Sequence, residues 1–342
     1  MNISKINLND LEKKLLKSYD LFICSASYEK RCLSIASNIE NIKIDNALIL
    51  SNIDLNEYIQ ENSSKLMSYF GDKSKCIEIN TSDPIITADN LDMNIAEITE
   101  SGCVNSILLD ITTFTHESLL ILFRLLKLRC PNTKITILYA NASGYSIGED
   151  FKHKWLSRGI GEVRSVLGYP GKIIPTQKTH LILIVGYEHE RAIGLIDALE
   201  PNSLALGYGR SGSATTEKDK DANEHYLHLV EQMTSSYEDV IEFEIPCNDP
   251  IGTKNEINKQ IHNAKGMNIL IAPMNNKLST IGTALASFEN DAVQLCYAQA
   301  LKYNYFNYST PGKECYILEL PSRSNALRWS DPADALRQKY KI

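Results

Sequence analysis

Two short stretches decide the fold: Asp20-Leu-Phe-Ile-Cys-Ser-Ala-Ser-Tyr28-Glu29 and His180-Leu-Ile-Leu-Ile-Val-Gly-Tyr187-Glu188. Each is an apolar run followed by small residues, a Tyr-Glu pair and a helix-like segment. Tyr187 lies 159 residues after Tyr28. Short, continuous apolar runs of this kind are typical of strands buried on both faces of a parallel sheet.

The same order of segments continues after both stretches. Ala47–Leu50 matches Ser203–Leu206, Ser106–Asp110 matches Asn268–Ala272, and Ile135–Ala140 matches Val293–Ala298, at offsets between 156 and 162 residues. An ordered series at nearly constant spacing predicts a tandem duplication.

Within each copy, short apolar runs alternate with longer segments of 3.6-residue period, which predicts parallel sheets covered by helices. Strands are expected near 20–25, 46–50, 75–79, 106–110, 134–139, 180–186, 203–207, 239–245, 268–272 and 292–297. Helices are expected near 1–18, 28–40, 56–70, 90–100, 116–129, 188–199, 216–236, 254–265 and 278–289. We therefore expect an α/β protein with two Rossmann-like domains packed as a pseudo-dimer. The predicted divisions are 1–145 for the first copy, 146–178 for a Gly/Pro-rich connector, 179–321 for the second copy and 322–342 for a tail.

The composition excludes several classes of protein. The chain has 342 residues, 43% hydrophobic residues and a formal net charge of -7, which argues against a disordered chain and against a general nucleic-acid coat. No apolar run reaches the length of a membrane span, and the N-terminus lacks a signal-peptide core. Eight cysteines without a Cys-x-x-Cys pair favour reduced thiols in a cytoplasmic protein.

Polar residues follow the first strand of each copy, where ligands gather in open α/β sheets. In the first copy, Ser25 and Ser27 would expose backbone N–H groups to an anion; a simple helix cap is the equal alternative. Tyr187 holds the corresponding place in the second copy. We expect the charged groups of Glu29 and Arg191 to lie on the surface.

The loops after the fourth strands carry a second group of candidates. In the first copy we expect Asp110, Thr112, Thr113 and His116 to bind phosphate, ribose or base; the alternative is that Asp110 caps turns and His116 is a surface residue. The second copy has Asn275 and Lys277 instead. A lysine at a helix start is unfavourable unless an anion accompanies it, so Lys277 is the first residue to mutate.

Other patterns are weaker. Gly207-Tyr-Gly-Arg210-Ser-Gly212 matches G-x-G-x-x-G but follows a second strand, so we read it as a mobile loop in which Arg210 contacts phosphate. We expect most of Tyr297, Tyr303, Tyr305 and Tyr308 to pack between the halves, with one or two exposed to the cleft, where a ring would stack a base. His225 and His228 lack a third ligand, and neither a metal nor a cofactor is predicted.

The duplicated halves and the strand end Asp110-Ile111-Thr112 resemble the CARF and SAVED families, Rossmann-like sensors of oligonucleotide second messengers in prokaryotic antiviral systems. In those families Asp-hydrophobic-Thr is followed by Gly-Gly-Thr-Lys or His-Gly-Phe-Arg, and the first-strand loop also contacts ligand. The resemblance implies ligand roles for Asp110, Ile111 and Thr112, and for Ser25 and Ser27. Lys277 falls near the families' terminal lysine, whereas His116 is displaced and the glycine is absent.

These observations lead to three hypotheses. The first is a nucleotide sensor, of a cyclic oligonucleotide in one form, that acts in antiviral defence through an effector protein partner. The second is an enzyme on a nucleotide or nucleotide-sugar (hydrolase, phosphodiesterase or glycosyl transferase) that uses Glu29, Asp110, His116 or Lys277. The third is a catalytically silent scaffold subunit. No catalytic residue is assigned, because this fold hosts many chemistries.

Overall fold

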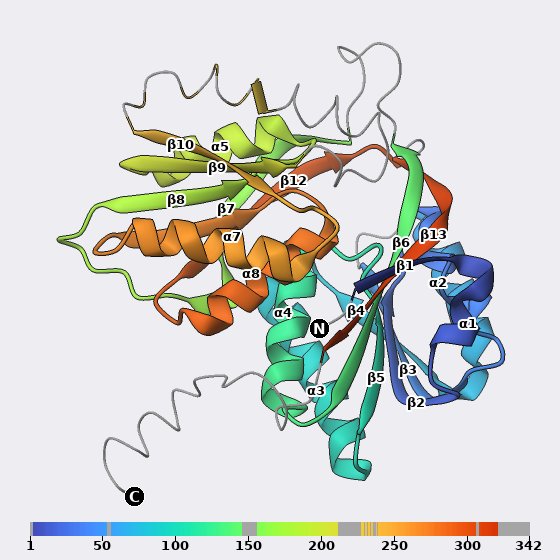
Figure 1. The fold of residues 1–342 in the computed structure, drawn as a ribbon. Helices are drawn as coiled ribbons and strands as arrows, with labels where there is room; N and C mark the ends of the chain where they lie inside the picture. The colour runs from blue at the N-terminus through green and yellow to red at the C-terminus, as the bar shows by residue number, and fades with distance from the viewer. Residues whose placement is uncertain are drawn as a thin grey trace, which may run out of the picture.

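The computed structural model describes residues 3–52, 56–145, 156–210, 239–305 and 308–320, together with 227, 228, 230, 232, 234 and 237. These residues form an α/β protein with two mostly parallel sheets (Figure 1), as predicted. No helix in this part of the chain is long and apolar enough to cross a bilayer.

The first sheet has seven strands in the order β1-β13-β6-β5-β2-β3-β4. Their bounds are β1 Ile3–Asn7, β2 Ser18–Ser25, β3 Lys43–Asn52, β4 Ser74–Ile79, β5 Ser106–Asp110, β6 Lys134–Tyr145 and β13 Ser309–Leu320. Strands β2 to β6 run parallel to their neighbours, whereas β13 is antiparallel to both β6 and β1.

The second sheet repeats this order as β10-β9-β8-β11-β12-β7. Its strands are β7 Ser157–Pro170, β8 Thr179–Ile184, β9 Ser203–Gly209, β10 Val240–Ile245, β11 Asn268–Pro273 and β12 Gln294–Tyr303. Strands β8 to β12 are parallel, and β7 is antiparallel to β12. Apart from β1, each strand of the first sheet has a counterpart at the same place in the second.

The antiparallel strands β7 and β13 are exchanged between the two halves of the chain. β7 follows β6 in sequence but joins the second sheet, and β13 follows β12 but returns to the first sheet. The long strands β6 and β13 lie side by side in Figure 1 although their residues are far apart in sequence. The predicted connector, 146–178, therefore contains a strand of the second sheet, and the predicted second copy supplies a strand to the first.

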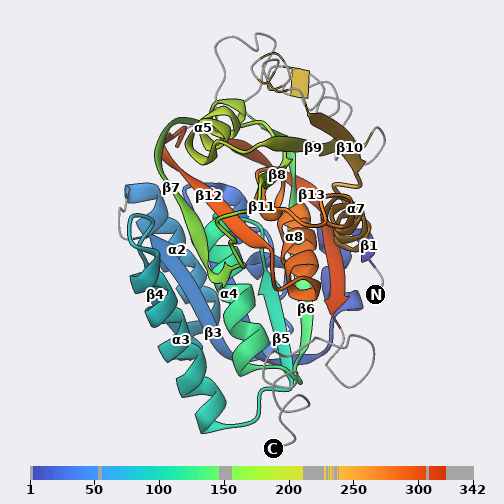
Figure 2. The same ribbon diagram turned by 90° about the vertical axis from the view of Figure 1, so that its left-hand side faces the viewer.

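Helices cover the sheets as the apolar periodicity predicts. Their bounds are α1 Leu11–Lys14, α2 Glu57–Phe70, α3 Pro84–Ser101, α4 His116–Arg129, α5 His189–Leu199, α7 Pro250–Asn263 and α8 Lys277–Glu289. α3 and α7 begin alike, with Asp83 or Asp249 as the N-cap and proline at the first helical position, where its missing N–H costs nothing. α4 and α8 pack against each other between the two sheets (Figure 2).

The contact between the halves is both apolar and charged. The rings of Phe123 on α4 and Phe288 on α8 stack with centroids 5.6 Å apart. Arg164 of β7 donates to both carboxylate oxygens of Glu117 on α4, at 2.9 and 2.8 Å. These contacts hold α4 against α8 and the start of α4 against β7.

Two predicted helices take another form. Residues 28–40 contain the 3₁₀ helices η2 Lys30–Leu33 and η3 Ala36–Asn38, because the buried positions Cys32, Ile35 and Ala36 also fit successive 3₁₀ turns. Residues 1–18 form β1, the 3₁₀ helix η1 Leu8–Asp10 and the single turn α1, since β1 completes the sheet beside β13. A fourth 3₁₀ helix, η4, spans Gly71–Lys73. The predicted helix 216–236 falls mostly outside the described residues.

The exchange makes a testable prediction for Leu318, a buried residue of β13 that lies opposite Ile137 of β6. Leu318→Ala should lower the free energy of unfolding by about 2–5 kcal/mol, because it leaves a cavity in the first sheet. The measurement is urea unfolding followed by circular dichroism. Leu301→Ala, at a residue that is 69% exposed, is the control and should change it by less than ~0.5 kcal/mol.

Hydrogen exchange then locates the strands that Leu318→Ala destabilises. Amides of β5 and β2 should exchange faster in Leu318→Ala. Faster exchange confined to β8, β9 and β11 would show that β13 belongs to the second half instead.

Candidate functional site

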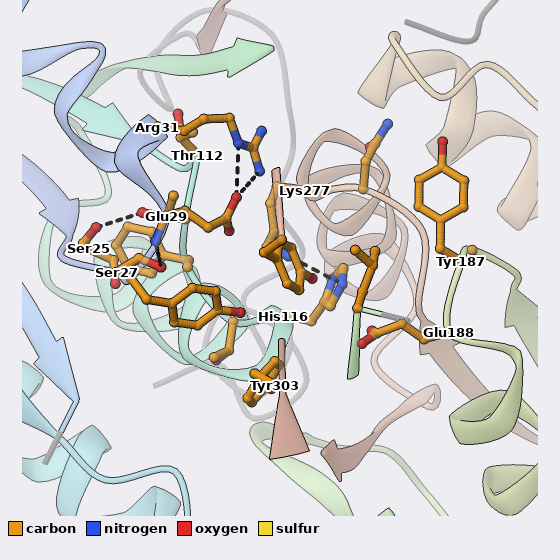
Figure 3. A pocket seen from close by; sticks show the side chains of 18 of the residues that line it. Ser25, Ser27, Glu29, Arg31, Thr112, His116, Tyr187, Glu188, Lys277 and Tyr303 are labelled. Atoms are coloured by element: carbon orange, nitrogen blue, oxygen red, sulfur yellow. Dashed lines mark hydrogen bonds and ion pairs between the residues drawn. The ribbon is translucent and has the colours of Figure 1, made fainter. Parts of the chain in front are cut away.

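A single pocket is formed by residues from the carboxyl ends of the parallel strands in both sheets (Figure 3). This is the edge at which open α/β sheets bind ligands. The pocket brings together most of the predicted contacts, namely Ser25, Ser27, Thr112, Thr113, His116, Tyr187, Asn275 and Lys277. Both halves of the chain therefore contribute residues to one pocket.

The loop after β2 holds a buried ion pair. Arg31 donates from Nε and Nη2 to Glu29 Oε2 at 3.0 and 2.8 Å, and from Nη1 to the carbonyl of Ala140 on β6 at 3.2 Å. Ser309, the first residue of β13, accepts from Arg31 Nε at 3.0 Å and donates to Glu29. We call this group (Glu29, Arg31, Ala140 and Ser309) the first clamp.

The loop after β8 holds its counterpart. Arg191 donates from Nε to the carbonyl of Ala298 on β12 at 3.0 Å and pairs with Glu188. Ser157, the first residue of β7, donates to Glu188. We call Glu188, Arg191, Ala298 and Ser157 the second clamp. Each clamp joins a first-strand loop to a last parallel strand and to an exchanged strand.

The clamps correct one expectation. Glu29 is 8% and Arg191 is 3% exposed, so the prediction that both lie on the surface was wrong. A buried guanidinium needs acceptors for its N–H groups, and the carbonyls of Ala140 and Ala298 supply them. These carbonyls come from strands remote in sequence, which is why the local pattern did not reveal the burial.

His116 and Lys277 meet between the clamps, as Figure 3 shows. They are the first residues of α4 and α8, and Lys277 Nζ lies 3.3 Å from His116 Nε2. Because an ammonium group can only donate, Nε2 accepts and Nδ1 carries the proton. Nδ1 donates to Thr280 Oγ1 at 2.6 Å, and Thr280 donates to the carbonyl of Asn276.

Burial tunes both groups. It lowers the pKa of His116 well below the usual value, and the positive charges of Lys277 and Arg191 add to the effect. Burial also lowers the pKa of Lys277 to about 8, although Glu188 and Glu29 oppose the shift. At neutral pH the pair is therefore a neutral imidazole beside an ammonium group. No carboxylate within the described part of the chain forms an ion pair with Lys277.

Tyrosine rings from both halves surround this pair. The rings of Tyr28 and Tyr303 have centroids 6.1 Å apart, and those of Tyr187 and Tyr145 lie 5.3 Å apart. Tyr28 also contacts Tyr305 and Tyr308, at 4.9 and 5.6 Å. All of these rings line the pocket, so Tyr303, Tyr305 and Tyr308 pack between the halves and also face the cleft.

Asp110 lies behind the pocket wall. It is 2% exposed, and its Oδ1 accepts from the backbone N–H of Thr112 at 3.0 Å and from the Thr112 hydroxyl. The same hydroxyl accepts from the N–H of Ala140 at 3.0 Å. Asp110 and Thr112 thus support the strand segment whose carbonyl binds Arg31. The prediction that Asp110 contacts a ligand fits this position poorly, because the carboxyl is already enclosed.

The remaining predicted contacts hold the loops in place. Thr113 Oγ1 donates to the carbonyl of Ser25 at 2.7 Å, Ser27 Oγ accepts from the N–H of Glu29 at 3.2 Å, and Asn275 Nδ2 donates to the carbonyl of Val185 at 2.7 Å. The last bond requires close approach of two loops. Gly186 stands where the first copy has Ser27. A Cβ at this position would lie 2.2 Å from the carbonyl oxygen of Met274, so the close approach of the two loops requires glycine.

Arg210 and Gly207 do not belong to this site. Arg210 is absent from the pocket lining; its Nε lies 3.2 Å from Glu244, and its N–H binds the carbonyl of Ile245 beside β10. Gly207 lies inside β9, where a Cβ would meet the ring of Phe243 at 2.6 Å. Packing in the sheet, not phosphate, explains this glycine. The expected mobile loop from 211 onward lies outside the described residues.

The pocket lining also contains Arg31, Glu188 and Arg191, which were not predicted as ligand contacts. The signal for the clamps was present, because Tyr-Glu precedes an arginine by a few residues in both copies. Of the predicted histidine pair, His228 is exposed, lies on the surface beside Gln232 and is outside the pocket lining, and His225 lies outside the described residues. The described residues contain no cluster of three or more metal-ligating side chains.

Comparisons with known proteins add little. No family model and no curated protein matches the sequence. Among solved structures, the chain is similar to an N-terminal ketoreductase from a macrolactin assembly line, with 11% identity over 85% of this chain and 72% of that chain. It is also similar to UDP-GlcNAc 2-epimerase from Neisseria meningitidis bound to UDP-GlcNAc, with 9% identity over 80% and 86% of the two chains. The TM-score is 0.23 in both cases, so the fold assignment rests on the strand order of this chain.

The enclosed carboxyl of Asp110 predicts a pH dependence of stability. Burial raises its pKa from 3.8 to about 7, so the folded protein binds a proton that the unfolded chain releases between these values. The contribution of Asp110 to the free energy of unfolding is therefore fully present below about pH 4 and is lost as the pH rises to 7. Its size is about 1.4 kcal/mol for each unit of pKa difference between the folded and unfolded states.

Asp110→Asn should remove this component, because the amide oxygen accepts the same two hydrogen bonds without a charge. The measurement is the free energy of urea unfolding of both proteins at pH 5 and pH 7.5. The wild type should lose stability relative to Asp110→Asn at the higher pH. A constant difference between them would show that Asp110 does not titrate in this range.

Proposed function

We propose that this protein binds a nucleotide in the pocket between its two halves. The observation that carries the proposal is the convergence, at one strand edge, of a cation that forms no ion pair with a described carboxylate, two helix N-termini and tyrosine rings from both sheets. Anions bind at helix N-termini and beside lysine, and aromatic side chains stack bases. A nucleotide combines both chemical features in one molecule.

The phosphate is placed at His116 and Lys277. Both residues begin helices, so the partial positive charges of α4 and α8 add to the ammonium charge. This arrangement is electrostatically unfavourable when the pocket holds only water, because Lys277 faces the positive end of its own helix. An anion beside Nζ would relieve that repulsion, which is the physical support for a phosphate here.

We further propose that the ligand is sensed and not turned over. The carboxylates of both glutamates in the described pocket lining are held in ion pairs: Glu29 Oε2 accepts from Arg31 and Ser309, and Glu188 pairs with Arg191 and accepts from Ser157. Both ring nitrogens of His116 are engaged as well. A general base needs a free acceptor within reach of the substrate. The finer proposal, a defence sensor that acts through an effector protein, rests on the resemblance to the CARF and SAVED families.

Thermal unfolding with added nucleotides tests the proposal. A panel of mononucleotides and cyclic oligonucleotides should include at least one that raises the melting temperature, because a ligand that binds only the folded state stabilises it. Chromatography of the ligand after incubation should return it unchanged. Products would identify an enzyme instead, and no shift with any member would refute nucleotide binding.

Substitutions of Lys277 test whether the phosphate of the nucleotide binds beside this residue. Lys277→Met should weaken binding of a nucleotide from that panel about 10- to 100-fold, because a charge-assisted hydrogen bond contributes about 1.5–3 kcal/mol. In the wild type, affinity should be fully present at pH 6.5 and should fall as the pH rises through about 8, when the ammonium group loses its proton. Lys277→Arg keeps its charge and should show no loss of affinity at pH 9.5.

Isothermal titration calorimetry measures these affinities. Lys265→Met is the control, because Lys265 is exposed and lies outside the pocket lining. Equal affinity in Lys277→Met and Lys265→Met would remove Lys277 from the binding site.

A further inference from the structure

The pocket has an approximate two-fold symmetry that its ligand should share. The two clamps are equivalent residue by residue: Glu29 corresponds to Glu188, Arg31 to Arg191, and Ala140 to Ala298. The serines agree as well, since Ser309 lies opposite Tyr145 in the first sheet and Ser157 lies opposite Tyr303 in the second. The axis passes between the starts of α4 and α8, where His116 meets Lys277.

The tyrosines follow the same symmetry. Tyr28 and Tyr187 come from equivalent first-strand loops, and Tyr303 and Tyr145 end the equivalent strands β12 and β6. The pairs form across the halves: Tyr28 of the first half contacts Tyr303 of the second, and Tyr187 contacts Tyr145. The pocket therefore presents two equivalent pairs of rings, and Tyr308 contacts one ring of each pair, Tyr28 at 5.6 Å and Tyr145 at 6.5 Å.

The charges add a second constraint. Each clamp pairs one guanidinium with one carboxylate and is neutral, and His116 is neutral. Among the described lining residues this leaves the Lys277 ammonium as the single surplus charge, and it lies on the axis. Two equivalent pairs of tyrosine rings and one surplus positive charge thus line the same pocket.

We propose that the ligand is one molecule that spans both halves, with two bases joined by a linker that carries a single negative charge at Lys277. Two nucleosides joined by one phosphodiester have this form. The inference rests on the proposed nucleotide binding and adds the number of bases and the charge. A triphosphate would bring several negative charges to a pocket whose described lining balances one, and the excess would remain desolvated and unpaired.

Calorimetry with defined probes tests this inference on the full chain. The probes are the dinucleoside monophosphates ApA, CpC, GpG and UpU, the matching mononucleotides and triphosphates, and the 5′-phosphorylated dinucleotides. At least one dinucleoside monophosphate should bind with one molecule per chain and about tenfold or more tighter than its mononucleotide. Its 5′-phosphorylated form and the triphosphate should bind more weakly.

Two variants separate the two pairs of rings. Tyr28→Ala and Tyr187→Ala should each weaken binding of the preferred dinucleotide about tenfold, and Tyr69→Ala, at an exposed tyrosine of α2, should leave it unchanged. Circular dichroism establishes that each variant is folded.

The outcomes distinguish this inference from the proposed function. Two mononucleotides per chain, or a triphosphate that binds more tightly than every dinucleotide, would overturn the single bridging ligand while nucleotide binding stands. Loss of affinity in only one of the two tyrosine variants would also overturn it. No binding by any probe would overturn both.

Discussion

The pocket depends on the requirement that a guanidinium removed from water must find acceptors for its N–H groups. Arg31 and Arg191 meet this requirement in the same way, with a carboxylate from their own loop and a carbonyl at the end of the last parallel strand. The carboxylates are held in turn by Ser309 and Ser157, which begin the exchanged strands. The exchange of β7 and β13 is therefore what completes each clamp, and neither half builds its own clamp from its own parallel strands and loops alone.

Both halves contain a clamp, but they differ at the approximate two-fold axis between the starts of α4 and α8. The first has His116 at the start of α4, and the second has Lys277 at the start of α8. Two lysines at these positions would repel each other and the helix N-termini, and two neutral histidines would leave the pocket without net charge. One residue of each kind gives a single positive charge whose position is fixed by the imidazole and, through it, by Thr280.

The sequence predicted the fold better than the site, and the difference has a physical origin. Strands such as β2 and β8 are buried on both faces, so their apolar runs carry the information locally. The partner of β13 is not encoded in that way, because an apolar run such as Tyr316–Leu320 fits either sheet. Burial of Glu29 and Arg191 was missed for the same reason, since Ser309, which donates to Glu29, and Ala298, which accepts from Arg191, are distant in sequence. Lys277 was identified because a cation at a helix start conflicts with the helix dipole, and that conflict is visible in the sequence.

The clamps also explain how the pocket can hold three cationic side chains in an acidic protein. A buried ion pair contributes little net stability, because desolvation offsets the attraction, but breaking it is costly. The clamps therefore act mainly by fixing geometry: they place two guanidinium groups at the wall with their charges already balanced. Since the balanced pairs add no net charge, the net charge of the described lining is set by Lys277 alone. The acidity of the chain as a whole, with its net charge of -7, is then compatible with a local site for one anion.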